Sequence, residues 1–216
     1  MIEIHKFTDV LQHIDGLKAI VFDLDDTLYG EKEYVKSGYF AVSQMLPQIK
    51  NAEAKLWQAF EEKKSAIDEL LLSEGIYTDE LKQKCLEAYR LHQPTIHLYD
   101  GVAQTLTLLR KQGFLLGIIT DGRPEGQWAK IKALKLTEYV DQIIVTDELG
   151  GAEYRKPNKK AFVLLKELFD VRFSEMCYVG DNIKKDFIPC EQLDIKPIYF
   201  ANKDGLYFDF SYSNRD

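Results

Sequence analysis

Short apolar runs recur along the chain, and most are followed at once by polar residues or glycine. Runs of four or five residues bounded in this way are typical of strands buried in a parallel sheet. The five runs occupy residues 19–22, 115–119, 142–145, 176–179 and 197–200. Between the later runs, apolar residues recur at the spacing of one helix face, in the groups Val102/Leu106/Leu109, Trp128/Ile131/Leu134 and Phe162/Leu165/Leu168. The alternation predicts an α/β fold built on a doubly wound parallel five-stranded sheet with helices on both faces.

Residues 29–98 interrupt this alternation, because they contain no convincing strand. Helical patterns cover residues 34–45, 52–72 and 79–91 instead, separated by Pro47, Ser73-Glu74-Gly75 and Pro94. We therefore expect an all-helical domain, 29–98, inserted into a core domain made of residues 1–28 and 99–216. At the other end of the chain, a turn signal at residues 202–205 and alternating apolar positions up to Phe210 predict a short terminal hairpin.

Acidic residues follow the first apolar run directly, in the sequence Asp23-Leu24-Asp25-Asp26-Thr27-Leu28. The carboxyl end of a parallel strand opens into a loop, which is where open α/β sheets bind ligands. The chain turns past the last paired residue, so the carboxylates of Asp23 and Asp25 can converge although they lie two positions apart. Charges that close repel unless a cation holds them, and carboxylates with water suit Mg²⁺. The alternative is that these acids only end the strand and cap the next segment.

Three further polar clusters follow other predicted strands. They are Thr120-Asp121-Gly122, Lys156-Pro157, and Gly180-Asp181-Asn182 with Asp186 shortly after. The carboxyl ends of parallel strands meet at one edge of a sheet, so these clusters and the first acids are expected to form one site.

In these residues the chain resembles the haloacid dehalogenase-like hydrolases. The motifs of that family are DxDxT, a Thr or Ser after the second strand, a Lys before a helix, and an acidic GD…D cluster. They are matched in order by Asp23/Asp25/Thr27, Thr120, Lys156 and Asp181/Asp186. The resemblance implies a Rossmann-like core, phosphatase chemistry, and a helical insert in the place of the family's first type of cap domain.

The two acids of the first motif suit different steps of phosphate ester hydrolysis. Attack of the Asp23 carboxylate on phosphorus forms an acyl phosphate, which splits one difficult hydrolysis into two easier steps. Asp25 can then protonate the leaving alkoxide and later take a proton from water, provided that its pKa lies well above that of a free Asp.

The remaining motif residues suit phosphate and metal binding. The Thr120 hydroxyl and the amides of Asp121 and Gly122 can donate hydrogen bonds to the transferring group, and Lys156 supplies a compact positive charge. Asp23 and Asp181 are expected to bind Mg²⁺ through carboxylate oxygens, and the resemblance implies that Asp25 does so through its backbone carbonyl. Asp186 is either a direct ligand or, as we prefer, a residue of the surrounding shell together with Asn182.

Composition narrows the partners. The 28 Lys and Arg residues against 35 Asp and Glu residues give a net charge of −7, which argues against nucleic acid or an anionic membrane as the main partner. Three cysteines without ligand spacing support neither a disulfide framework nor a zinc site. No signal peptide or membrane-spanning run is recognisable, so we expect a cytoplasmic protein.

The sequence thus predicts a Mg²⁺-dependent phosphatase acting on a small phosphorylated metabolite, with an undetermined oligomeric state. A dehalogenase is disfavoured, because its halide leaving group needs no proton from Asp25. Two alternatives stay open: a phosphomutase acting on a sugar phosphate, and a catalytically silent protein that keeps the fold for binding or regulation.

Overall fold

A computed structural model describes residues 1–206 and 208 of the chain. The chain forms two compact units, one made of Met1–Glu31 with His97–Asp216 and the other of Lys32–Ile96. The helical insert was expected at 29–98, and the second unit occupies nearly the same stretch. The predicted terminal hairpin involves residue 207 and residues 209–216, which lie outside the described residues.

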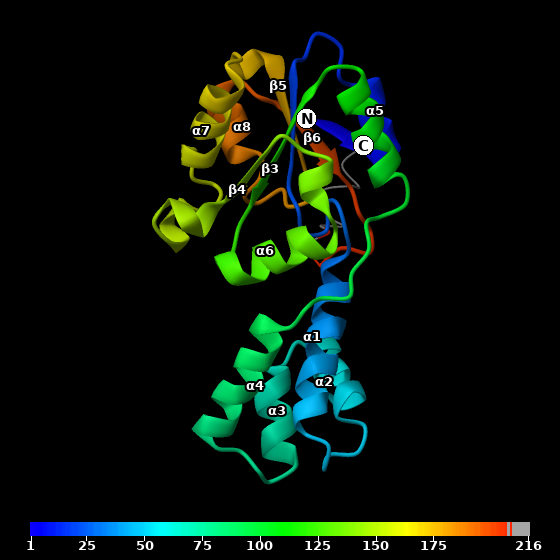
Figure 1. Cartoon of the computed structure of the whole chain (residues 1–216), viewed down its shortest axis with the longest axis vertical. Coiled ribbons are helices and arrows are strands. Elements are labelled where there is room, and N and C mark those ends of the chain that lie inside the picture. The colour runs from blue at the N-terminus through cyan, green and yellow to red at the C-terminus, as the bar shows by residue number, and fades with distance from the viewer. Residues whose placement is uncertain (207, 209–216) are drawn as a thin grey trace. The chain divides into compact units, whose positions relative to one another are not determined.

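The first unit is built on a six-stranded sheet in which all neighbouring strands are parallel (Figure 1). Its order is β1-β6-β5-β2-β3-β4. The strands are β1 (Ile2–Ile4), β2 (Ala19–Phe22), β3 (Leu115–Thr120), β4 (Gln142–Val145), β5 (Met176–Gly180) and β6 (Lys196–Phe200). The five predicted strands are all present, but the predicted number is wrong by one. The additional strand, β1, is three residues long and pairs with β6 at the edge of the sheet, too short to stand out as an apolar run.

Strand β2 lies in the middle of the sheet, between β3 and β5. Its last residue, Phe22, is in register with Ile118 of β3 and Val179 of β5. The next residue, Asp23, still donates its backbone N–H to the Val179 carbonyl at 2.9 Å. The polar residues that follow these strands therefore start at nearly the same level of the sheet.

Helices connect the strands and cover the two faces of the sheet. They are α5 (Val102–Lys111), α6 (Pro124–Ala133), α7 (Lys160–Phe169) and α8 (Ile188–Leu193), with short 3₁₀ segments at Phe7–Gln12, Leu136–Glu138, Thr146–Leu149, Ala152–Tyr154 and Phe173–Glu175. Val21 and Tyr178 share a core cluster with Leu165 of α7. On the other face, the ring of Phe22 packs against Phe7, with centroids 5.6 Å apart. Figure 1 shows α7 and α8 on one side of the sheet and α5 on the other.

The second unit is helical throughout its regular structure. Its helices are α1 (Glu31–Met45, of which the first residue belongs to the sheet unit), α2 (Ala52–Glu61), α3 (Ala66–Ser73) and α4 (Asp79–Leu91). Val42, Leu56, Leu71 and Cys85, one from each helix, are fully buried in its core. The prediction of one helical stretch over 52–72 is wrong, because the helix is interrupted between α2 and α3. Lys63, in this interruption, adopts the left-handed conformation with φ of 58°.

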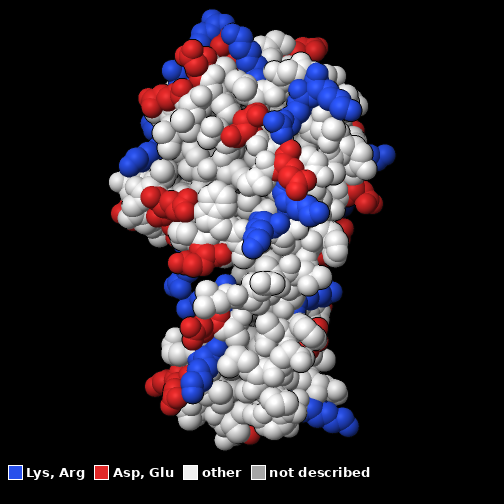
Figure 2. Space-filling model, in the orientation of Figure 1, with Lys and Arg blue, Asp and Glu red and all other residues white. Residues whose placement is uncertain are grey.

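The surface carries charged side chains of both signs. On the face shown in Figure 2, basic and acidic side chains are interspersed rather than gathered by sign. Among residues 1–206 and 208, no helix combines the length and the apolar character needed to cross a bilayer.

Candidate active site

Three acids from separate segments converge beyond the carboxyl ends of β2 and β5. Asp23, Asp181 and Asp186 are all buried, and each offers a carboxylate oxygen within 4.8 Å of those of the other two. Asp23 directly follows β2 and Asp181 directly follows β5, while Asp186 lies in the turn before α8. The structure thus brings together the three acids that the sequence placed at this edge of the sheet.

The ammonium group of Lys156 lies among these acids. Its Nζ is 2.7 Å from Asp23 Oδ1 and 2.9 Å from Asp186 Oδ1, and the side chain is fully buried. Burial alone would lower the pKa of Lys156, but the charges of Asp186 and Asp23 outweigh burial and raise the pKa well above its ordinary value. Lys156 therefore remains an ammonium ion that ties the nucleophile candidate to Asp186.

Tyr178 is a site residue that the sequence analysis missed. Its hydroxyl accepts a hydrogen bond of 2.7 Å from Lys156 Nζ and donates to the Ile119 carbonyl at 3.4 Å. The residue lies inside the apolar run of β5, where nothing in the pattern distinguishes it from ordinary core. Tyr178 fixes the direction from which Lys156 approaches Asp23.

The acids carry more negative charge than Lys156 offsets. Burial, partly opposed by Lys156 and reinforced by Asp186, raises the pKa of Asp23 from 3.8 to about 6. Burial and the neighbouring charges of Asp23 and Asp186 raise the pKa of Asp181 well above its ordinary value. The Thr27 hydroxyl donates to Asp181 Oδ1 at 3.3 Å, whereas Asp181 Oδ2 is buried and accepts no hydrogen bond from the described residues. A buried carboxylate oxygen in this state is suited to a cation.

Asp186 has both carboxylate oxygens engaged by the protein. Oδ1 forms the ion pair with Lys156, and Oδ2 accepts the backbone N–H of Asn182 at 2.9 Å. The Asn182 side chain turns back to accept the N–H of Lys184 at 3.1 Å, which stabilises the loop after β5. Gly180 makes room for this arrangement, because a Cβ there would lie 2.5 Å from Asp186 Oδ2.

The Asp121 side chain has a role that the sequence analysis did not predict. Its carboxylate accepts the backbone N–H of Lys156 and the Thr146 hydroxyl, each at 3.0 Å, and Lys185 Nζ at 3.2 Å. Burial would raise the pKa of Asp121, but Lys156 and Lys185 outweigh it and lower the pKa. Asp121 therefore holds the loop that carries Lys156. This loop includes the cis peptide bond between Lys156 and Pro157.

Asp25 is surrounded by hydrogen-bond donors. Lys130 Nζ lies 2.7 Å from its Oδ1, the Gln127 amide donates to Oδ2 at 2.9 Å, and the Tyr29 hydroxyl also donates to Oδ1. Burial would raise the pKa of Asp25, but Lys130 and these hydrogen bonds outweigh burial and lower it. The condition for Asp25 to act as a proton donor on its own, a pKa well above that of a free Asp, is therefore not met, because donors from a distant helix act on this carboxylate. In this state Asp25 is a carboxylate, the form that accepts a proton from water.

Thr120 is the last residue of β3 and is linked to Asp25 through Gln127. The Gln127 amide nitrogen donates to the Thr120 hydroxyl as well as to Asp25, and its amide oxygen accepts from Lys130 Nζ at 2.7 Å. Gly122 has a φ of 141°, and a Cβ there would lie 3.2 Å from Gln127 side-chain carbons. Glycine at this position thus leaves space for the Gln127 side chain.

Gln127 and Lys130 were missed because the apolar pattern covers only part of the buried face of α6, on which Ile131 and Leu134 are buried as predicted. The spacing of Trp128, Ile131 and Leu134 predicted an apolar buried face. The Trp128 side chain is instead 38% exposed and donates to Glu148 at 2.8 Å, while Gln127 and Lys130 are buried. The only available signal was a polar pair three residues apart on a helix that starts just after Thr120-Asp121-Gly122.

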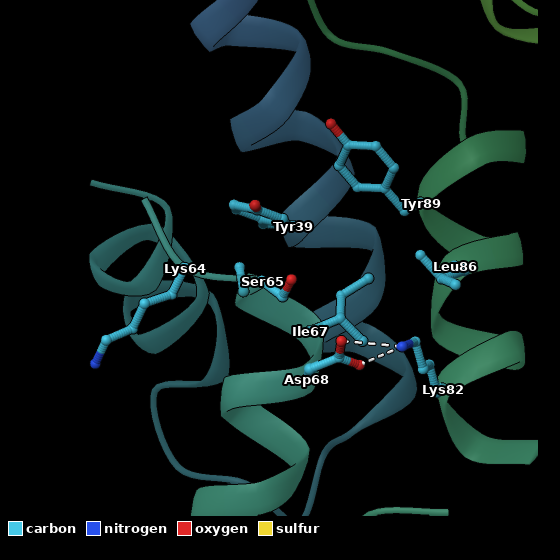
Figure 3. A pocket seen from close by; sticks show the side chains of 9 residues that line it. Tyr39, Lys64, Ser65, Ile67, Asp68, Lys82, Leu86 and Tyr89 are labelled. Carbon is cyan, nitrogen blue, oxygen red and sulfur yellow. Dashed lines mark hydrogen bonds and ion pairs between the residues drawn. The ribbon is translucent and has the colours of Figure 1, made fainter. Parts of the chain in front are cut away.

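The helical unit contains a pocket of its own, with a volume of about 430 Å³. Figure 3 shows Tyr39, Ile67, Leu86 and Tyr89 around it, together with the ion pair between Lys82 and Asp68, whose Nζ and Oδ1 atoms lie 2.9 Å apart. Its mixed lining suits a small organic group with a polar end.

Comparison with known proteins gives consistent matches. A family model described as haloacid dehalogenase-like hydrolase matches residues 17–194. The chain is 28% identical over 219 residues to glyceraldehyde 3-phosphate phosphatase of Methanocaldococcus jannaschii, covering 90% of this chain and 92% of the relative. It is 33% identical over 130 residues to (S)-2-haloacid dehalogenase 1 of a Pseudomonas species, covering 60% and 53%. The fold is shared with the putative HAD-hydrolase YfnB of Bacillus subtilis, solved bound to magnesium, with a TM-score of 0.61 at 23% identity over 85% of this chain and 86% of that one.

Proposed function

Because the chain belongs to the haloacid dehalogenase-like hydrolases, we propose that it is a Mg²⁺-dependent phosphatase that hydrolyses a small phosphorylated metabolite through an aspartyl phosphate. The observation that carries this proposal is the buried Asp23 carboxylate, held 2.7 Å from Lys156, together with the carboxylate of Asp25, two positions further along the chain, which has its own set of donors. The relative named as a glyceraldehyde 3-phosphate phosphatase supports a small phosphate ester as the substrate.

In the proposed reaction, an oxygen of Asp23 attacks phosphorus while the bond between phosphorus and the ester oxygen breaks. Lys156 stabilises negative charge beside the attacking carboxylate, and Thr120 donates a hydrogen bond to a phosphoryl oxygen. Asp25 is a carboxylate in the free protein, so it relays to the leaving alkoxide the proton that the ester's phosphate group carries as a monoanion, and it is again a carboxylate afterwards. It then takes a proton from the water that attacks the aspartyl phosphate, which releases inorganic phosphate and regenerates Asp23.

The acids fit a magnesium ion. Buried carboxylate oxygens are the hard ligands that Mg²⁺ prefers, and Oδ2 of Asp181, which accepts no hydrogen bond from the residues that the structure describes, is suited to a cation. We propose that Asp23 and Asp181 hold the ion with the backbone carbonyl of Asp25. Asp186 Oδ2 accepts a hydrogen bond from Asn182, whereas Oδ1 accepts none from the described residues but is in an ion pair with Lys156, and this ion pair favours an orienting role for Asp186. When bound, the ion supplies positive charge for the phosphoryl group.

The donors around Asp25 favour phosphate over halide chemistry. A carboxylate that exchanges protons contributes to catalysis only when the leaving group or the attacking water needs a proton transfer. A departing halide needs none. A phosphomutase would use the same first step and return the phosphoryl group to a sugar.

We also propose that the protein works in the cytoplasm, since its three cysteines are free and buried.

We expect the purified protein to release inorganic phosphate from p-nitrophenyl phosphate in the presence of Mg²⁺ and to stop when EDTA is added. A panel of phosphate esters that includes glyceraldehyde 3-phosphate, with kcat/KM for each, would define the substrate. Release of inorganic phosphate in proportion to substrate loss supports a phosphatase. Conversion of a sugar phosphate into its isomer without net phosphate release would favour the phosphomutase, and no reaction with any ester would contradict the proposal.

We expect the stability of wild-type protein relative to Asp23→Asn to fall as the pH rises, when both are measured without metal. The raised pKa of Asp23, about 6, means that the folded protein holds this proton more tightly than the unfolded chain does. The resulting stability is fully present below about pH 4 and is lost as the pH rises through about 6, by up to about 3 kcal/mol.

Urea denaturation in EDTA between pH 4 and 8 measures this difference. Saturating Mg²⁺ should stabilise the wild-type protein more at pH 8 than at pH 5, because protons compete with the metal for the same oxygens. Parallel stability profiles for the two proteins would show that Asp23 does not titrate in this range.

A further inference from the structure

Two residues outside the four motifs connect separate parts of the site. Gln127 and Lys130 lie one turn apart on α6; Gln127 contacts both Asp25 and Thr120, and Lys130 contacts Asp25. Both are buried, with 4% and 5% of their surface exposed. Burying an ammonium ion and an amide is costly unless each is paired, and these contacts supply the pairing.

The chemistry of the partners determines how the Gln127 amide is oriented. Lys130 can only donate, so the Gln127 atom 2.7 Å from its Nζ has to be the amide oxygen. The amide nitrogen then faces Asp25 and Thr120, and it has two hydrogens, one for each of these oxygen atoms. The arrangement therefore satisfies every hydrogen-bonding group of Gln127.

This orientation has a consequence for Thr120. Its hydroxyl oxygen accepts from Gln127, which can only donate at that atom, so the hydroxyl hydrogen has to point to another acceptor. Thr120 stands at the carboxyl end of β3, the edge of the sheet where the acids converge. The hydroxyl is thereby prepared to donate to an oxygen of a bound phosphoryl group.

We infer that Gln127 and Lys130 are positioning residues that hold the Asp25 carboxylate and the Thr120 hydroxyl in the orientation needed for phosphoryl transfer. The inference rests on the proposed function, and it extends the site to a helix that contributes none of the motif residues. Lys130 acts through Asp25, whereas Gln127 acts through both Asp25 and Thr120. Their removal is therefore expected to give different kinetic patterns.

The leaving group of the substrate distinguishes these patterns. p-Nitrophenolate leaves without a proton, whereas an alkoxide requires one, which the correctly oriented Asp25 carboxylate has to relay to it. We expect Lys130→Met to lower kcat/KM by about 10- to 100-fold for an alkyl phosphate and by less than about threefold for p-nitrophenyl phosphate. Gln127→Leu should show the same dependence together with a loss of about tenfold on p-nitrophenyl phosphate, because Thr120 is also affected.

Two controls separate positioning from a general effect on the fold. Lys132 is exposed on the same helix, so Lys132→Met removes an equal charge and should leave every rate unchanged. Circular dichroism and urea midpoints report whether each variant folds. If Lys130→Met does not fold, the uncharged substitution Gln127→Leu still tests the inference.

A double-mutant cycle with Asp25→Asn, measured with phenyl phosphate, tests whether Lys130 acts through Asp25. Lys130→Met should then cost less than about threefold in the Asp25→Asn background, because the residue it positions is already gone. Losses of kcat/KM that multiply in the double variant, or that are equal for all leaving groups, would overturn the inference. The proposed phosphatase function would stand in either case. A wild-type protein that hydrolyses no ester would instead refute the proposed function and this inference with it.

Discussion

Lys156→Met is expected to abolish turnover and to lower the free energy of unfolding by about 3–5 kcal/mol at neutral pH. Lys156 is fully buried, and its Nζ contacts the carboxylates of Asp23 and Asp186. Its removal leaves Asp23 and Asp186 without the ammonium group that pairs with them, close to a third buried acid, Asp181, and buried charges without partners are costly. The stability loss should be larger at pH 8 than at pH 5, where the acids can take up protons instead.

Urea denaturation in EDTA, combined with phosphate release in Mg²⁺, measures both effects. Lys159→Met is the matched control, because Lys159 is exposed three residues further along the chain and contacts none of these acids in the described site. The control should leave stability and turnover close to wild type. A Lys156→Met protein that is as stable as wild type at pH 8 would show that the acids do not depend on this ammonium group.

The sheet and the motif residues were predictable because a parallel sheet converts sequence position into spatial position. Once the apolar runs are recognised as neighbouring parallel strands, the residues after each run lie at one edge. The register of β2 with β3 and β5 brings Asp23, Thr120 and Asp181 to that edge. No knowledge of side-chain contacts was needed for this part of the site.

The contacts around Asp25 were not predictable in the same way. Lys130 lies 105 positions further along the chain than Asp25, and its helix was expected to bury Trp128 instead. A hydrophobicity pattern selects the apolar face of a helix, so it overlooks a polar pair that is buried because distant residues satisfy it. The pKa of Asp25 depends on that pair, so the sequence could not show that the condition of a raised pKa is not met.

Tyr178 illustrates the same limit within a strand. A tyrosine in an apolar run is interpreted as a core residue. The ring of Tyr178 does pack against Phe162, with centroids 5.0 Å apart. Its hydroxyl contacts the site through Lys156, whose Nζ also lies 5.3 Å from the centroid of the ring. A residue that serves the core with its ring and the site with its hydroxyl gives a sequence signal for the first role alone.

Asp23→Asn is expected to lower kcat by about 10⁴-fold or more while preserving the fold. Asparagine has nearly the size and shape of the carboxylate, but its amide is a poor nucleophile. Lys156 keeps its ion pair with Asp186 in this variant, so no ammonium group is left buried without a partner. In EDTA at pH 8 the variant should be at least as stable as wild type, because the raised pKa of Asp23 shows that its ionised form is disfavoured in the fold.

Rapid acid quenching followed by peptide mass spectrometry tests the assignment directly. Wild-type protein should carry one phosphoryl group on the peptide that contains Asp23, and the Asp23→Asn protein should carry none. Asp170→Asn is a suitable control, since Asp170 is exposed and its left-handed backbone, with φ of 50°, is one that asparagine tolerates. Undiminished turnover in Asp23→Asn, or a phosphoryl group on a different acid, would show that the covalent step begins elsewhere in the site.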